Sequence, residues 1–150
     1  MPGQAIVTIS NKQWACSVAN TFTEVTTGLS GVESLDEGEG MLFDLGLDYS
    51  QIDIDMSRML FPLDIVFINS NRGVVGVLHD VQPGEEASLS NETSPGARFF
   101  LEINAGEAEG IEVGEEVQIQ GDITENNLSP IMSYLPIFMV LIMGMTMVSF

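Results

Sequence analysis

The sequence predicts a mainly β domain followed by one C-terminal transmembrane α-helix. Apolar and polar residues alternate at period two in 4–19 and 51–56, and further short apolar runs bounded by turn residues follow up to 121, which is the pattern of strands. Helical periodicity is scarce in this part. Residues 131–150, in contrast, contain no Asp, Glu, Lys, Arg or His. We therefore divide the chain into a β domain at 1–121, a polar hinge at 122–130 and a transmembrane helix at 131–150.

The strands of the β domain can be placed in order along the chain. We expect them at 4–10, 13–19, 41–46, 51–56, 63–68, 74–81, 97–106 and near the end of 107–121. The first two are joined at a polar Ser-Asn-Lys turn, and the strands at 63–68 and 74–81 form a hairpin around the turn at 69–73. The Gly-rich stretch 23–40 is expected to be a loop with room for a short helical turn, and 82–96 a polar loop.

The C-terminal segment 131–150 has the length of a membrane span. Twenty residues at helical rise extend about 30 Å, which is the thickness of one bilayer core. Pro130 suits the first turn of a helix. The alternative is an apolar helix buried inside an oligomer. Since no signal peptide is recognisable, we expect a single-pass tail anchor with the β domain on the cytoplasmic side, although no Lys or Arg follows Arg98 to set the orientation.

The composition excludes some classes of partner. The chain has 22 acidic residues against four basic ones and a formal net charge of -18. Such a surface repels phosphate backbones, so we expect no nucleic-acid binding, and it repels anionic lipid headgroups. Cys16 is the single cysteine, so no intrachain disulfide can form, and we interpret it as a small buried apolar residue.

A set of short motifs resembles a known family. They are Gly28-Leu29, Glu39-Gly40-Met41-Leu42-Phe43, Pro62-Leu63-Asp64, Ala97-Arg98, Asn104-Ala105-Gly106, Gly110-Ile111 and Gly114-Glu115. In this order, over about Gln4 to Gln120, the chain resembles the family called domain of unknown function 192. The resemblance implies a compact, mostly antiparallel β fold like a partly open barrel, with a short helix or two. It implies no settled activity.

The chain also departs from that family. Relatives carry an aromatic-Trp-Met-Lys-Asn run before Pro-Leu-Asp, whereas this chain has Ile54-Asp55-Met56-Ser57-Arg58. The Met that follows Gly-Leu in the family is Ser30 here. If those residues form a ligand site in relatives, that site is lost or altered. The apolar C-terminal segment lies outside the family pattern, and both departures favour a repurposed scaffold.

Two acidic constellations have a functional and a simpler interpretation. Asp48, Asp53, Asp55 and Asp64 could supply oxygen ligands to Ca²⁺, but their spacing matches no EF-hand loop, so we favour a solvated acidic face and no metal. His79 beside Asp80 could be a general base, but no nucleophile lies nearby in the sequence. We favour an ordinary histidine at a strand end.

Two further sets of residues are candidate binding groups. Arg98 is expected to pair with Asp64 or Glu102 inside the fold, and the alternative is a ligand-binding site for an acidic molecule at Arg98 and Asp64. In the C-terminal segment, Met139, Met143 and Met147 share one face of the expected helix, with Gly144 beside them. Thioethers can bind Cu(I), but we favour packing against lipid or partner helices.

Together these features predict a non-catalytic structural or accessory protein that needs no cofactor. The C-terminal segment would contact membrane lipid and other membrane-embedded subunits, and the β domain would dock protein partners in an oligomeric or multi-subunit assembly, cellular or in a virion. One alternative is a membrane-tethered module that binds a sugar, a peptide or a small acid. A weaker alternative is an enzyme.

Overall fold

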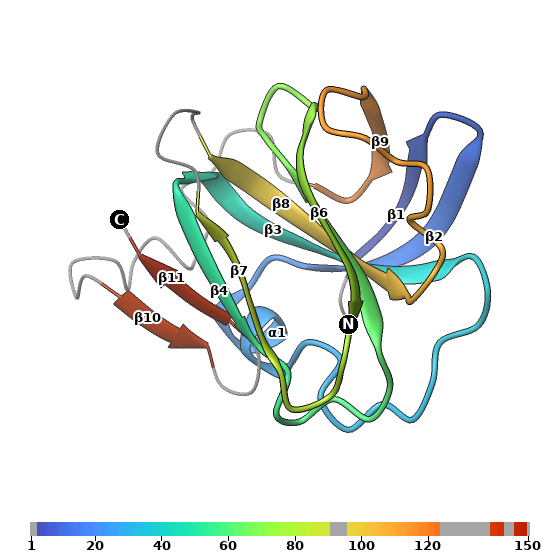
Figure 1. Cartoon of the computed structure of the whole chain (residues 1–150). Helices are drawn as coiled ribbons and strands as arrows, with labels where there is room; N and C mark the ends of the chain where they lie inside the picture. Colours follow the sequence, from blue (N-terminus) through green and yellow to red (C-terminus); the bar gives the residue numbers. More distant parts are fainter. Residues whose placement is uncertain (1–2, 91–95, 124–138, 143–145, 150) are drawn as a thin grey trace.

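The computed structural model describes residues 3–90, 96–123, 139–142 and 146–149, the last two segments by their backbone alone. The strands are β1 (Gly3–Ile9), β2 (Lys12–Ala19), β3 (Glu39–Tyr49), β4 (Gln51–Asp55), β5 (Leu63–Ile68), β6 (Val74–Val81), β7 (Glu86–Ser90), β8 (Ala97–Asn104), β9 (Val117–Gly121), β10 (Met139–Ile142) and β11 (Thr146–Ser149), and the helix is α1 (Phe22–Thr27). They form a seven-stranded sheet in the order β6-β5-β8-β3-β2-β1-β9 and a four-stranded sheet in the order β10-β11-β4-β7 (Figure 1).

The first two strands form the hairpin that their alternation predicts. Val7 and Ile9 of β1 are buried, as are Trp14, Cys16 and Val18 of β2, whereas the residues that alternate with them are more exposed. Val7 lies opposite Trp14 in the antiparallel register. This pattern arises because successive side chains of a strand point to opposite faces, so every second residue reaches the core.

The middle of the seven-stranded sheet is apolar on both faces. Every residue of β5 is buried, and so is every residue of β8 except its last. On one face Phe43 and Phe100 stack with ring centroids 4.3 Å apart, within a cluster that extends to α1 and to the smaller sheet. On the other face Phe99 and Leu101 pack with residues of β1, β2 and β9. The two clusters fix the register of the central strands from both sides.

One strand pair is parallel, which departs from a purely antiparallel sheet. β2 and β3 run in the same direction, with Ala15 opposite Glu39. Two parallel strands must be joined by a crossover connection, and the crossover from β2 to β3 contains α1. The helix lies in the stretch for which the sequence predicts a short helical turn. A capping box starts the helix, since the Thr21 side chain accepts a hydrogen bond from the Glu24 N–H at 3.1 Å and the Glu24 carboxylate accepts one from the Thr21 N–H at 3.2 Å.

The larger sheet curls but does not close into a barrel. Its two edge strands are β6 and β9, and an isolated bridge joins Gly73 to Glu116 next to their starts. The Val117 N–H also donates to the Arg72 carbonyl at 2.8 Å. The prediction of a mainly β domain is confirmed, and the sheet remains open.

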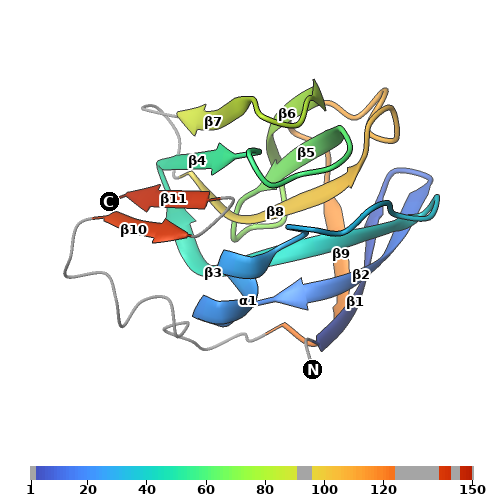
Figure 2. The ribbon, with the colours of Figure 1, turned by 90° about the horizontal axis from the view of Figure 1, so that it is seen from below.

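Two sequence-based assignments need correction. The predicted loop at 82–96 contains β7, which pairs with β4. The helix predicted over 131–150 is wrong for its described parts, because 139–142 and 146–149 are the antiparallel strands β10 and β11, and β11 pairs with β4 (Figure 2). The rest of 131–150 lies outside the described residues. Where the chain is described, no helix is both long enough and apolar enough to span a bilayer.

Candidate functional site

Asp64, a predicted ligand-binding residue, ties together three segments of the backbone. It is the second residue of β5 and is fully buried. Its Oδ2 accepts hydrogen bonds from the N–H groups of Gly106 and Ala108, each at 2.9 Å, and its Oδ1 accepts one from the Asp80 N–H at 2.9 Å. Buried carboxylates with several backbone donors are structural anchors. The carboxylate therefore holds the turn after β8 against the end of β6.

His79 lies at the edge of this cluster. Its Nδ1 is 3.6 Å from the Asp64 Oδ2, and its side chain is 53% exposed. Because the same carboxylate oxygen already accepts two backbone hydrogen bonds, the imidazole is a peripheral contact. The cavity described below does not include His79 among its lining residues. This placement matches the favoured interpretation of a histidine at a strand end.

Arg98, the other predicted ligand-binding residue, forms a buried ion pair with Asp44. Arg98 Nε is 2.9 Å from Asp44 Oδ1, and Arg98 Nη2 is 3.0 Å from Asp44 Oδ2. The guanidinium also lies over the Phe99 ring, 4.6 Å from its centroid. The expected pairing with Asp64 or Glu102 is therefore wrong. The register explains why, since Asp44 lies opposite Phe99 whereas Asp64 lies opposite Ile103, about 13 Å further along β8.

The four aspartates considered as calcium ligands are dispersed. Asp48 accepts a hydrogen bond from the Ser70 N–H, Asp53 from the Gln51 side chain and Asp55 from the Ser57 N–H. Among the described residues, no group of three or more His, Cys, Asp or Glu side chains is arranged to hold a metal ion.

The residues predicted to form a packing face in the C-terminal segment are divided. Met139 lies in β10 and Met147 in β11, where Met147 is opposite Asp53 of β4. Their spacing by four therefore does not correspond to one helical face. Met143 and Gly144 lie outside the described residues.

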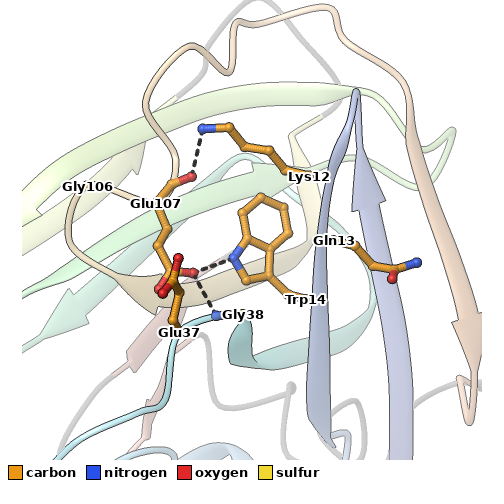
Figure 3. A pocket seen from close by; sticks show the side chains of 7 residues that line it. All are labelled: Lys12, Gln13, Trp14, Glu37, Gly38, Gly106 and Glu107. Carbon is orange, nitrogen blue, oxygen red and sulfur yellow. Dashed lines mark hydrogen bonds between the residues drawn. The ribbon is translucent and has the colours of Figure 1, made fainter.

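The sequence reasoning missed a cavity of about 370 Å³ formed where three turns meet. It is lined by Lys12, Gln13, Trp14, Glu37, Gly38, Gly106 and Glu107 (Figure 3). These residues come from the start of β2, the turn before β3 and the turn after β8. The figure shows the Gln13 side chain pointing away from the indole of Trp14, to the other face of β2.

The Glu107 carboxylate organises this cavity. Its Oε1 accepts hydrogen bonds from Trp14 Nε1 at 2.7 Å and from the Gly38 N–H at 3.4 Å, and its Oε2 accepts one from Asn104 Nδ2 at 3.2 Å. Lys12 Nζ donates to the backbone carbonyls of Glu107, at 3.1 Å, and Glu109. A carboxylate and an ammonium group thus face the same cavity beside an indole ring.

A separate feature of the core is the carboxyl group of Glu102. It is fully buried, and neither oxygen has a hydrogen-bond partner among the described residues. Its register neighbours are Met41 on β3 and Ile65 on β5, both members of the apolar cluster next to α1. Burial raises the pKa of Glu102 to about 8, because an apolar environment disfavours the charged form.

Cys16 is an inert buried thiol. It is 1% exposed in the cluster formed with β1 and β9. Burial raises its pKa to about 12. These properties agree with the predicted role as a small apolar core residue.

Comparison with known proteins assigns a family but no activity. Residues 5–119 match the DUF192 family, described as "Uncharacterized ACR". This range agrees with the predicted resemblance over Gln4 to Gln120. No curated protein resembles the chain closely enough to count as a match.

Two solved structures share this fold. A protein of unknown function from Novosphingobium aromaticivorans DSM 12444 aligns with a TM-score of 0.66 and 28% identity, over 77% of this chain and 83% of that one. A proposed transcription regulator from Sinorhizobium meliloti 1021 aligns with a TM-score of 0.67 and 24% identity, over 77% of this chain and 92% of that one. The second similarity concerns the fold alone.

Proposed function

Because the chain belongs to the DUF192 family, which has no assigned activity, we propose from its own residues that it is a non-catalytic accessory protein. Its acidic β domain is attached through the apolar C-terminal segment 131–150 to a membrane or to the apolar subunits of a membrane-embedded assembly. The absence of charge from that segment carries the proposal, since the chain as a whole has 22 acidic and four basic residues. Twenty uncharged residues of this composition favour lipid or apolar protein over water.

The placement of β10 and β11 suits a segment that can exchange partners. β11 pairs with β4 through backbone register contacts from Thr146 opposite Ile54 to Ser149 opposite Gln51. β10 is then an edge strand of the smaller sheet. A short two-stranded addition at a sheet edge is held by few ladder contacts. We propose that the apolar segment rests at this edge in the free chain and leaves it to contact lipid or a partner subunit.

The polar groups singled out by the sequence support a non-catalytic role. Asp64 is occupied by three backbone donors and Arg98 by Asp44. His79 contacts only the periphery of the Asp64 cluster in the described structure, at 3.6 Å. A catalytic constellation needs titratable groups that converge on one accessible cleft, and these groups instead hold the fold together.

Co-flotation with neutral phosphatidylcholine vesicles tests the attachment. The full-length chain is expected to float with the vesicles. A variant with Leu141→Glu and Val148→Glu is expected to remain in the soluble fraction, because charged side chains are costly in the bilayer. A variant with Asp53→Glu and Asp55→Glu is the matched control. It is changed outside segment 131–150 and keeps the acidic charge of β4, so it should float like the wild type.

Circular dichroism on the same samples shows whether each variant keeps its β structure, so that loss of flotation is not confused with unfolding. Equal flotation of the wild type and the doubly charged variant would refute the attachment. A wild-type chain that neither floats with the vesicles nor co-purifies with a membrane subunit would refute it as well.

A further inference from the structure

The cavity beside Trp14 has no role in the attachment proposed above. It lies where the start of β2, the turn before β3 and the turn after β8 converge. Its volume of about 370 Å³ falls within the range of small-molecule sites, which runs from about 300 to 1,000 Å³. The question is which chemistry its walls would accept.

The walls offer both a donor and acceptors for hydrogen bonds. An ammonium group has three N–H donors, and within the described structure Lys12 uses two of them on the carbonyls of Glu107 and Glu109. The Oε2 of Glu107 accepts one described hydrogen bond, from Asn104, although a carboxylate oxygen can accept two. Glu37 is exposed and adds a second carboxylate to the rim. A ligand can therefore accept from Lys12 and donate to Glu37 or Glu107.

Charge restricts the ligand further. The cavity has two carboxylates and one ammonium group, in a chain with a net charge of -18, so an anion would be repelled. A cation would meet the ammonium group of Lys12, which is fixed in place by two carbonyls. A neutral group that both donates and accepts hydrogen bonds can pair with the ammonium group and with the carboxylates at once. The hydroxyl group is such a group.

The remaining walls leave open space for the body of such a ligand. Trp14 is among the lining residues, but it is only 2% exposed and its indole is held by the Nε1 hydrogen bond to Glu107, so it forms part of the buried wall of the cavity. Gly38 and Gly106 border the same space, and a Cβ added at Gly106 would meet no atom within 4 Å. Backbone without side chains therefore leaves room for a ligand next to the indole (Figure 3).

We propose that this cavity binds a neutral carbohydrate, with sugar hydroxyl groups hydrogen-bonded to Lys12, Glu37 and Glu107. The Glu107 carboxylate and the Lys12 ammonium group are already positioned by their contacts within the fold, so little order is lost when a ligand arrives. No residue that lines the cavity belongs to segment 131–150, so failure of this proposal would leave the proposed attachment untouched.

Trp14 is the only tryptophan of the chain, so its fluorescence and its indole N–H NMR signal come from one residue, whose Nε1 is bonded to Glu107 of the cavity. The full-length chain would be titrated with glucose, galactose, mannose, N-acetylglucosamine, maltose and cellobiose. Inorganic phosphate and spermidine serve as charged comparison probes. We expect a saturable change with at least one of the sugars and none with phosphate.

Matched variants assign the change to the cavity. Glu37→Ala removes an exposed carboxylate at the rim and is expected to weaken sugar binding about tenfold. Glu39→Ala removes an exposed carboxylate two residues away that does not line the cavity, and should bind like the wild type. The proposal is overturned if no sugar of the panel perturbs Trp14, if spermidine or phosphate binds more tightly than every sugar, or if the two variants behave alike.

Discussion

Arg98 and Asp44 form a two-point ion pair between neighbouring strands, 54 residues apart in the sequence. The side chains are 7% and 2% exposed, so the pair is almost entirely removed from water. Arg98 is one of only four basic residues, and the structure uses it to neutralise a carboxylate in the core. The pair therefore serves the fold and leaves the guanidinium unsuited to capture a ligand.

Removal of one partner of this pair should be more damaging than removal of both. We expect Asp44→Ala to lower the free energy of unfolding by about 3–5 kcal/mol, because it leaves Arg98 buried without its counter-ion. The double variant Asp44→Leu with Arg98→Met should lose less than Asp44→Ala, since no buried charge remains. Urea unfolding followed by circular dichroism measures both values. A double variant that loses as much free energy of unfolding as Asp44→Ala, or more, would contradict this account.

Asp64 should be a second stability determinant. Asp64→Ala leaves the N–H groups of Asp80, Gly106 and Ala108 without their acceptor, and we expect a loss of about 2–4 kcal/mol in the free energy of unfolding. Asp53→Ala removes a carboxylate that bonds only the Gln51 side chain among the described contacts, and should change stability by about 0.5 kcal/mol or less. Equal losses for the two variants would show that the Asp64 anchor is not needed.

Glu102 should make stability fall as the pH rises. Its pKa is raised from 4.5 to about 8 in the folded chain, so between these values the folded state holds a proton that the unfolded state has released. Stability therefore decreases with increasing pH across this window, by an amount of the order of a few kcal/mol. Glu102→Gln removes this titration and keeps the shape of the side chain.

The pH experiment compares Glu102→Gln with the wild type by urea unfolding at several pH values across that window. The free energies of unfolding of the two proteins should differ least near the acidic end of the window, where both side chains are neutral. The variant should become the more stable protein as the pH rises toward 8. Glu39→Gln, at an exposed position, controls for the loss of one surface carboxylate. A constant difference between Glu102→Gln and the wild type would contradict a raised pKa.

Cys16 should resist thiol reagents until the chain unfolds. Its side chain is 1% exposed, and its pKa is raised to about 12, so little thiolate exists at neutral pH. We expect alkylation by iodoacetamide to be at least about 100-fold slower in buffer than in concentrated urea. Mass spectrometry of the intact chain over time gives both rates. Rapid labelling of the folded chain would show that the hairpin of β1 and β2 opens readily.

Strands with local signals could be predicted well from the sequence. The hairpin predicted at 63–68 and 74–81 has the same bounds as β5 and β6, since apolar runs flank a turn marked by Asn and Gly. β7 was missed because its pattern is mostly polar, with Leu89 as its one buried residue. Length and lack of charge predicted a helix in 131–150. These cues do not distinguish a helix from the two short strands that add to the edge of β4.

The candidate sites depended on contacts that sequence spacing does not reveal. Arg98 could be recognised as a buried base in need of a carboxylate, but the choice of Asp44 follows from the register of β3 and β8. The cavity was missed because Trp14 and Glu107 are 93 residues apart. The only cues were the single tryptophan, the scarce Lys12 near it, and the glycine just before Glu107.

The place of β1 within the sheet has a consequence for synthesis on the ribosome. β1 lies between β2 and β9, so the first strand of the β domain pairs on one side with the last strand of that domain. Until Val117–Gly121 has left the exit tunnel, β1 presents an open edge that can recruit strands from other nascent chains. Slow translation of the second half of the domain should therefore raise the yield of aggregated product more than slow translation of the first half.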